Sequence, residues 1–187
     1  QRVSARNKQV SCGEDIISRI IYSGRENGLV ELQRLVIETI NELLWELAKI
    51  NDFSAADITE VVIAGNTTMT HLFLGISPHH LRLEPYTPAA TNFPVVKAAE
   101  LDLWTNPSAA VYFLPAVAAY VGGDITAGVL SSCLFQNEKL SLFLDVGTNG
   151  EIVLGNQDWM MTVACSAGPA FEGAGVKDGM RAVAGAI

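Results

Sequence analysis

The stretch that most constrains the fold is residues 142–155, which read LFLDVGTNGEIVLG. Two apolar runs flank a polar turn, and this pattern predicts a β-hairpin. The pair Asn149-Gly150 predicts a two-residue turn, because both residues tolerate positive φ. Gly147 and Gly150 would let a ligand approach the backbone, whose turned N–H groups suit an anion. Asp145 would orient a hydrated divalent cation rather than touch phosphate, since like charges repel. An ordinary surface hairpin is the alternative.

The composition supports a folded protein whose ligands are not nucleic acids. Apolar residues make up 49% of the 187 positions and charged residues 17%, so the chain can bury a sizeable core. The net charge is −8, and no basic stripe offsets the acidic residues. Phosphate binding would therefore depend on backbone N–H groups and a metal ion rather than on lysine and arginine.

The three cysteines, Cys12, Cys133 and Cys165, are far apart and form no C-x-x-C pair. This spacing fits a reducing compartment and excludes a self-contained iron–sulfur or zinc site within the chain. We expect three free, buried thiols. No signal peptide is visible, and the apolar run 109–122 is short for a membrane span and contains Pro115. The expectation is a piece of a longer cytoplasmic protein without a membrane segment.

The first two-thirds of the chain predict helices around buried strands. Apolar residues share one face in 16–21 and recur at helical spacing over 30–50. Residues 60–65 (EVVIAG) predict a buried strand, and Asn66 can cap a helix that ends at Gly75. This turn would lie at a carboxyl strand edge, where open sheets bind ligands. A plain cap is the alternative. The histidines lack metal-ligand spacing and should be hydrogen-bonded or exposed: His71, His79 and His80.

The next segments combine an irregular stretch with a second strand and helix. Five prolines punctuate residues 77–107, which predicts an excursion on the domain surface and a possible partner-binding loop. Residues 111–117 predict a buried strand. Gly122 and Gly123 would permit close approach of backbone or ligand before the helix ITAGVLSSCLF. Asp124 could cap that helix or direct its carboxylate toward the same site as Asp145, and the two roles are compatible.

The last segment predicts a third strand at 159–164 and then a loop of small residues at 165–175. Gly168 and its neighbouring glycines expose backbone in this loop. It could close over a nucleotide, or its glycines could serve structural turns alone. We place a domain boundary in the polar turn 136–139.

This order of elements resembles the actin-like ATPase superfamily of sugar kinases, heat-shock chaperones and actin. LFLDVGTNGEIVLG is similar to its second phosphate hairpin, and AAYVGGDITAGVL to the connecting helix before it. The resemblance implies an α/β, ribonuclease H-like fold that is only partly present. Residues 1–137 would form the later part of the first lobe, and residues 138–187 the beginning of the second.

Five motifs together resemble the reductive activators of corrinoid proteins: CGEDIISRI, VVIAGNTTMTHLFLG, YVGGDITAGVL, LDVGTNGEIVLG and ACSAGPAFEGAGVKDGMRAVAGAI. The resemblance implies use of ATP and Mg²⁺ to drive electron transfer to a Co(II) corrinoid protein of a methyltransferase system, giving Co(I). It also implies a [2Fe–2S] domain, which would lie outside this chain. The first phosphate hairpin and the adenosine motif are likewise missing, so we expect the chain alone to be inactive. The resemblance leaves open whether the protein forms a homodimer.

The resemblance implies roles for individual residues. Asp145 and Asp124 would be the catalytic and metal-positioning carboxylates on the two sides of a cleft. Seven further residues would line the nucleotide: Gly147, Thr148, Asn149, Gly150, Gly122, Gly123 and Gly168. Two alternatives remain, a small-molecule kinase on the same fold and a non-enzymatic scaffold that binds a partner through residues 77–107.

Overall fold

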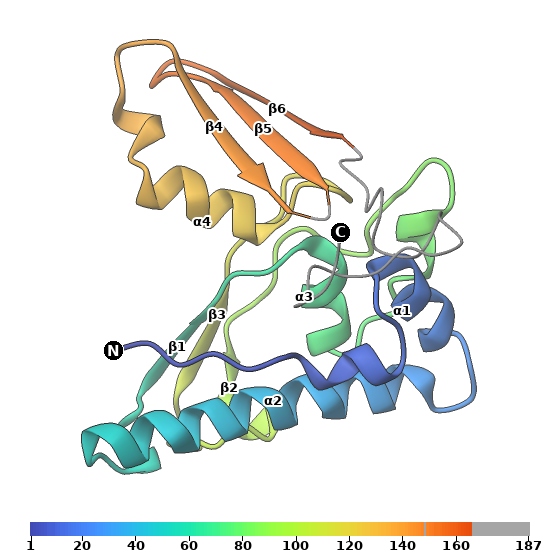
Figure 1. The fold of residues 1–187 in the computed structure, drawn as a ribbon, viewed down its shortest axis with the longest axis vertical. Coiled ribbons are helices and arrows are strands. Elements are labelled where there is room, and N and C mark those ends of the chain that lie inside the picture. The colour runs from blue at the N-terminus through green and yellow to red at the C-terminus, as the bar shows by residue number, and fades with distance from the viewer. Residues whose placement is uncertain (148, 166–187) are drawn as a thin grey trace, which may run out of the picture. The chain divides into compact units, whose positions relative to one another are not determined.

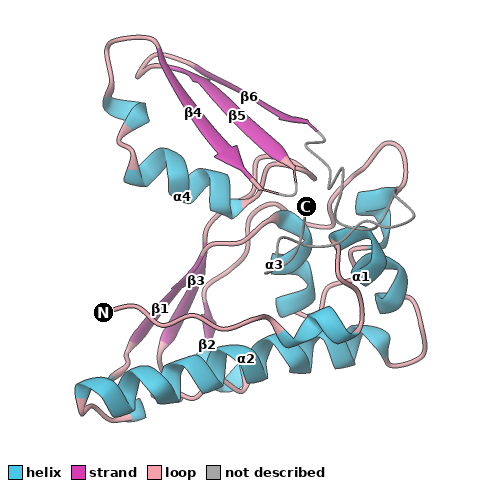
Figure 2. Ribbon diagram, viewed as in Figure 1, coloured by secondary structure: helices cyan, strands magenta, loops and turns pink. Residues whose placement is uncertain are grey.

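The computed structural model describes residues 1–147 and 149–165 and divides the chain into two compact units, Gln1–Ala127 and Gly128–Ile187 (Figures 1 and 2). None of the described helices combines the length and the hydropathy that crossing a bilayer requires. The helices and strands are α1 (Ile16–Ser23), α2 (Gly28–Asn51), β1 (Glu60–Ile63), α3 (Thr67–Phe73), β2 (Val96–Lys97), β3 (Ala110–Phe113), α4 (Gly123–Ser131), β4 (Ser141–Val146), β5 (Gly150–Gly155) and β6 (Met160–Cys165).

The first unit is built on a three-stranded sheet of order β1-β3-β2. β1 and β3 are parallel, with Val61 opposite Val111, and β2 is antiparallel to β3. The long helix α2 lies beside this sheet (Figure 1). Its apolar stripe supplies Val36 and Ile37 to the main core, where they join Phe73 of α3 and Val111 of β3. The helix predicted at 30–50 is confirmed, with one additional turn divided between its ends.

The prediction of a buried strand at 60–65 is wrong in its burial and its length. β1 ends at Ile63, and its residues alternate between exposed and half-buried positions. Val62 is 61% exposed, whereas Val61 and Ile63 pack against the core. β1 has a neighbouring strand on one side only among the described residues. A β-branched run therefore identified the strand, but it did not show whether both of its faces are covered.

The prediction of a surface excursion at 77–107 is wrong for much of that stretch. It contains β2 and two short 3₁₀ helices, His79–Arg82 and Ala98–Leu101. Leu101 and Leu103 belong to the main core, and Leu81 is buried in a second cluster with Ile20 of α1. These side chains make part of the stretch a structural layer of the first unit.

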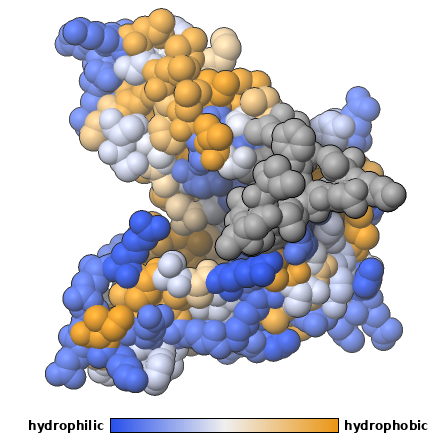
Figure 3. All heavy atoms as spheres, viewed as in Figure 1, coloured by the Kyte–Doolittle hydropathy of each residue, from blue (hydrophilic) through white to orange (hydrophobic). Residues whose placement is uncertain are grey.

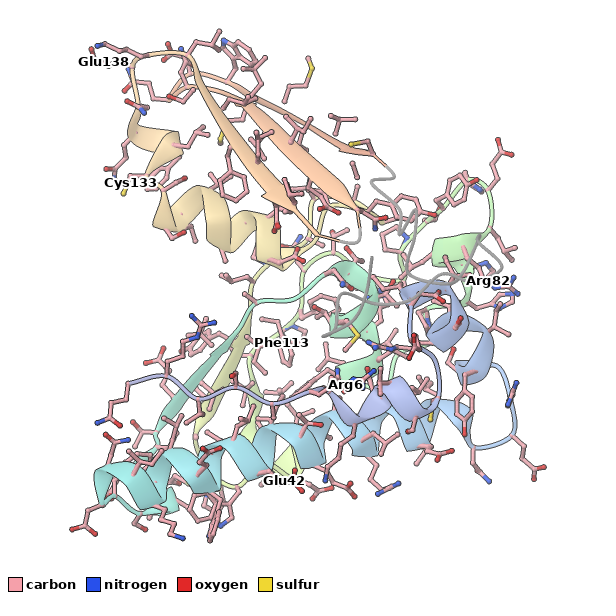
Figure 4. The ribbon with its side chains drawn as sticks, in the orientation of Figure 1. Arg6, Glu42, Arg82, Phe113, Cys133 and Glu138 are labelled. Atoms are coloured by element: carbon pink, nitrogen blue, oxygen red, sulfur yellow. The ribbon has the colours of Figure 1, made fainter. Side chains whose placement is uncertain are left out.

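The second unit contains an antiparallel sheet of order β4-β5-β6. Cys133 and Glu138 lie on the connection that leads from α4 to β4 (Figure 4). Val146 pairs with Gly150, so the hairpin connection is residues 147–149, and Gly150 already belongs to β5. The predicted hairpin is confirmed, but its two-residue Asn149-Gly150 turn is wrong. Within the connection, the Gly147 N–H donates to the carbonyl of Asn149 at 2.9 Å.

Candidate functional site

In the first unit, the candidate site begins where the two parallel strands end. Parallel strands place their carboxyl ends at one sheet edge. β1 ends at Ile63 and leads to Asn66, whose side chain accepts a hydrogen bond from the Met69 N–H at 2.9 Å. The predicted helix cap is thereby confirmed. β3 ends at Phe113, which is labelled in Figure 4, and leads toward α4.

The two loops that follow these strands are in direct backbone contact. A Cβ atom on Gly122 would lie 2.4 Å from Cα of Asn66, and one on Gly123 would lie 2.5 Å from the Leu114 carbonyl oxygen. The Thr67 hydroxyl donates to the Ala118 carbonyl at 2.7 Å. The glycine pair is therefore required for close packing of backbone on backbone. Its predicted contact with a nucleotide stays a prediction.

Asp124 lies in the first turn of α4 and is tied to both loops. Its N–H donates to the Gly65 carbonyl at 3.2 Å. Its carboxylate accepts the N–H of Ile125 at 2.9 Å, and acidic groups at this end of a helix are favoured by the helix dipole. This geometry fits the helix-terminus role that the sequence indicated. The role of Asp124 toward a metal ion stays a prediction.

In the second unit, the candidate site is the β4–β5 hairpin. Asp145 is half-buried, and its partner in the strand register is Glu151 of β5. The side chains of Asp145 and Phe143 share one face of β4, because alternate residues of a strand point to the same side. A Cβ atom on Gly147 would meet one atom within 4 Å, the Asn149 carbonyl oxygen at 3.7 Å. Among the described residues, the space beside Gly147 is thus open, unlike the space beside Gly122.

Sequence reasoning missed the pairing of Asp145 with Glu151. The signal was present in the spacing, because the two residues are equally far from the Val146–Gly150 pair once the register is known. The predicted two-residue turn at Asn149-Gly150 concealed it. Directly opposed residues of an antiparallel pair lie close enough to interact, so both carboxylates contribute negative charge to this end of the hairpin.

The metal site at the hairpin stays a prediction. Among the described residues, no group of three or more His, Cys, Asp or Glu gathers around one point. Mg²⁺ usually retains waters and is bound through one or two carboxylates together with substrate phosphates. Asp145 offers such a carboxylate beside the open backbone of Gly147. Thr148 and Gly168, two further predicted nucleotide ligands, lie outside the described residues.

The histidines take up the two environments that the sequence allowed. His79 and His80 are exposed. His71 is completely buried on α3, and its Nδ1 donates to the Thr67 carbonyl at 2.7 Å. Its Nε2 has no hydrogen-bond partner among the described residues, and the ring packs edge-on against Phe93. Burial lowers the pKa of His71, and the hydrogen bond to Thr67 opposes this shift.

The prediction of buried thiols is wrong. All three cysteines are free, but Cys133 and Cys165 are exposed and Cys12 is half-buried. Cys165 ends β6 opposite Gly150 of the hairpin, and its Sγ donates to the Gly150 carbonyl at 3.1 Å.

Two families match the chain in succession. The family described as "RACo middle region" matches residues 1–137, and "C-terminal domain of RACo the ASKHA domain" matches residues 139–187. The boundary between the two matches lies C-terminal to the division of the compact units after Ala127, and that division falls within α4.

Individual relatives agree with the families. Corrinoid activation enzyme RamQ of Eubacterium limosum is 39% identical over 185 residues, which are 98% of this chain and 31% of RamQ. A Methanosarcina barkeri protein named [Co(II) methylated amine-specific corrinoid protein] reductase is 40% identical over 73 residues, which are 39% of this chain and 14% of that protein.

A solved structure gives the same result. The structure of a protein named "Reductive activator for corrinoid,iron-sulfur protein" matches 95% of this chain and 28% of its own chain, with 55% identity and a TM-score of 0.84. This chain therefore spans less than a third of the length of the relatives that match it over nearly all of its residues. It belongs to the RACo family of corrinoid activators, with residues in both the middle region and the C-terminal ASKHA domain of that family.

Proposed function

We propose that the full-length protein uses ATP to drive the reduction of a Co(II) corrinoid protein to Co(I), and that this chain supplies part of its ATPase. The observation that carries the proposal is the match of 98% of the chain to a corrinoid activation enzyme at 39% identity. The names of the solved relative and of the Methanosarcina barkeri relative indicate the same chemistry. These relatives favour a reductive activator over a small-molecule kinase or a scaffold.

Asp145 is the residue that we assign to the metal. Bound Mg²⁺ would neutralise the charge of the β- and γ-phosphates and polarise the oxygens around the transferred group. Asp145 would hold a water of the ion, because direct contact of its carboxylate with phosphate is repulsive. Its place at the end of β4 beside the open Gly147 supports this role. Thr148, Asn149 and Gly150 would complete the phosphate side.

Asp124 is proposed to face Asp145 across the nucleotide. Residues four apart lie on the same face of a helix, so Asp124 shares a face of α4 with Gly128. Gly128 packs closely on the ring of Phe143, since a Cβ atom there would lie 2.3 Å from Cζ. Phe143 and Asp145 share one face of β4. The resemblance to actin-like ATPases is what supports this arrangement, to which Gly122, Gly123 and Gly168 would contribute backbone.

Other parts of the activity would lie elsewhere in the full-length protein. The three described cysteines are free and widely spaced in sequence, so the [2Fe–2S] cluster would be held by other residues. The partner would be the corrinoid protein of a methyltransferase system, and the compartment the cytoplasm. A homodimer is compatible with this proposal but is not required by it. We expect the 187-residue chain by itself to hydrolyse no ATP.

The test is an isosteric substitution in the full-length protein. Asp145→Asn removes the charge while retaining the shape, so ATP hydrolysis and the absorbance change from Co(II) to Co(I) should both fall by about 100-fold or more. Asp158→Asn is the matched control, because this residue is exposed in the turn before β6 and should leave both rates unchanged. Wild-type rates for Asp145→Asn with an intact fold would remove the hairpin from the mechanism.

A further inference from the structure

A short turn lies on the connection from β3 to α4 in the first unit. The N–H groups of Val117 and Ala118 donate to the Val121 carbonyl at 2.8 and 3.1 Å, and the Val121 N–H donates back to the Ala118 carbonyl at 3.3 Å. We call residues 117–121 the β3–α4 turn. Because α4 begins at Gly123, almost directly after this turn, a shift of the turn would move the start of the helix.

The side chain of Thr67 holds the β3–α4 turn from the neighbouring helix. Thr67 is the first residue of α3 and is 1% exposed. Its hydroxyl donates to the Ala118 carbonyl at 2.7 Å, which is shorter than the bond that the same carbonyl accepts within the turn. A β-branched side chain is restricted about its first torsion, and the Thr67 carbonyl is itself bonded to Nδ1 of His71 at 2.7 Å. The hydroxyl is therefore a fixed donor to the turn.

The backbone beside Thr67 also contacts the first residues of α4 and the glycine before them. The Asp124 N–H donates to the Gly65 carbonyl at 3.2 Å, and the backbone of Gly122 packs on that of Asn66 without room for a Cβ atom. Both of these contacts are made by backbone atoms, and Thr67 adds a side-chain hydrogen bond to them. A valine of nearly the same shape would leave the carbonyl in the turn, among the described residues, with its longer bond alone.

We propose that Thr67 is a positioning residue of the ATPase, which acts through the Ala118 carbonyl to set the place of Asp124. The inference rests on the proposed function, in which Asp124 is a metal-positioning carboxylate. Thr67 itself would touch neither nucleotide nor metal, because its side chain is buried and its hydroxyl donates to Ala118. A catalytic group must be held close to its productive geometry, and a misplacement of about 1 Å can reduce a rate about 100-fold. The alternative is that Thr67 contributes to stability alone.

The test measures the kcat of ATP hydrolysis, the KM for ATP and the melting temperature of variants of the full-length protein. Thr67→Val removes the hydroxyl and should lower kcat by about tenfold or more, with KM changed by less than about twofold. A misplaced Asp124 would affect the transition state more than it affects the binding of ATP. Thr67→Ser retains the hydroxyl and should keep kcat within about threefold of the wild type.

Thr39→Val is the matched control. Thr39 is 5% exposed, and its hydroxyl donates to the Leu35 carbonyl at 2.8 Å, so the substitution removes a hydrogen bond of the same kind. That bond lies within α2, around which the surface is largely hydrophilic in Figure 3. Thr39→Val should lower the melting temperature as Thr67→Val does and should keep the wild-type kcat. Equal losses of kcat in the two valine variants would show an effect of stability and overturn the proposal.

A combined substitution separates a role through Asp124 from any other role of Thr67. The measurement is single-turnover hydrolysis, which detects low rates. Adding Thr67→Val to Asp124→Asn should slow hydrolysis by less than about twofold, because the carboxylate that Thr67 positions is already removed. A further loss of about tenfold would show that Thr67 acts on another group and would overturn the proposal.

The wild type distinguishes failure of this proposal from failure of the proposed function. Absence of ATP hydrolysis by the wild-type full-length protein would overturn the proposed function and the assignment of Thr67 together. Hydrolysis by the wild type with an unchanged kcat in Thr67→Val would overturn the assignment of Thr67 alone. If Thr67→Val does not fold, Thr67→Ala removes the same hydroxyl and has the same expected results, with Thr39→Ala as its control.

Discussion

The sheets of the two units differ in how their central strands are buried. In the first unit β3 lies between β1 and β2, and its Val111 is completely buried in a core shared with α2 and α3. In the second unit β5 is central, and Val153 is the one large apolar side chain that is buried among the described residues of its three strands. The first unit has a core of its own, whereas the described residues of the second unit bury Val153 on one face of their sheet. Identical substitutions should therefore have different effects in the two units.

The largest difference in stability between the two units should come from replacing a leucine with alanine. Leu72 of α3 is completely buried, and Leu142 of β4 is 57% exposed. Leu72→Ala should lower the free energy of unfolding by about 4 kcal/mol, because it leaves a cavity. Leu142→Ala should lower it by at most about 0.5 kcal/mol, as expected for a surface position. Urea unfolding of the 187-residue chain measures both, and a comparable loss for Leu142→Ala would show that its face is already covered in this chain.

The next largest difference concerns two glycines of the candidate site. Gly122→Ala brings a Cβ atom within 2.4 Å of the Asn66 backbone and should cost about 3 kcal/mol of stability through overpacking. Gly147→Ala meets open space among the described residues, and the φ of Gly147 lies outside the left-handed region, so the stability should change by less than about 0.5 kcal/mol. Thermal unfolding measures both effects.

Activity measurements on the full-length protein separate structure from ligand binding at these glycines. If the nucleotide approaches the open side of Gly147, Gly147→Ala should reduce ATP hydrolysis while the melting temperature stays unchanged. Loss of activity in Gly122→Ala should instead accompany loss of fold. Gly122→Ala with wild-type stability would contradict the close packing of the two loops.

Features that depend on residues close together in the sequence were easier to predict than features that depend on residues far apart in the sequence. The period of α2 and the apolar runs of the hairpin are local, and both elements were predicted correctly. The burial of Leu101 and Leu103 could not be foreseen, because it depends on packing against helices far away in the sequence. The requirement for Gly122 likewise arises from contact with Asn66, 56 positions earlier by their numbering.

The same distinction holds for the candidate site. The carboxylate of Asp145 was identified from its local setting at the end of an apolar run. Its pairing with Glu151 was missed, because a turn one residue longer than expected changes every cross-strand partner. The role of Asp145 stays a prediction, whereas the register is observed, and register decides which charged groups face each other.

A smaller effect should follow from removing the cap of α3. Asn66→Ala removes the side chain that accepts the Met69 N–H, and should lower the stability of the first unit by about 1 kcal/mol. Asn66→Asp retains an acceptor at the cap and should lose much less. Hydrogen exchange of α3 amides reports on this helix directly. Equal exchange rates in Asn66→Ala and Asn66→Asp would show that the Asn66 side chain does not hold the turn. The contact of the Asn66 backbone with Gly122 would then hold it.

The smallest effect on stability at neutral pH should come from the protonation of His71. This effect concerns the first unit alone. Its Nδ1 must carry hydrogen, because the Thr67 carbonyl can only accept, so a second proton would have to enter at the buried Nε2. Burial lowers the pKa of His71 in the fold, so its stabilising contribution is complete above the ordinary value of about 6.5. That contribution is lost as the pH falls below this value, since the unfolded chain then binds the proton more readily.

The pH profile of stability distinguishes this histidine from the exposed ones. The melting temperature of the wild type should fall between pH 7 and pH 5, and His71→Gln should flatten part of that fall. His80→Gln changes an exposed side chain and should leave the wild-type profile in place. Parallel profiles for wild type and His71→Gln would mean that Nε2 gains a hydrogen-bond partner from water or from residues outside the described part of the chain. The core of the first unit would then contain a polar contact at His71 in addition to its apolar packing.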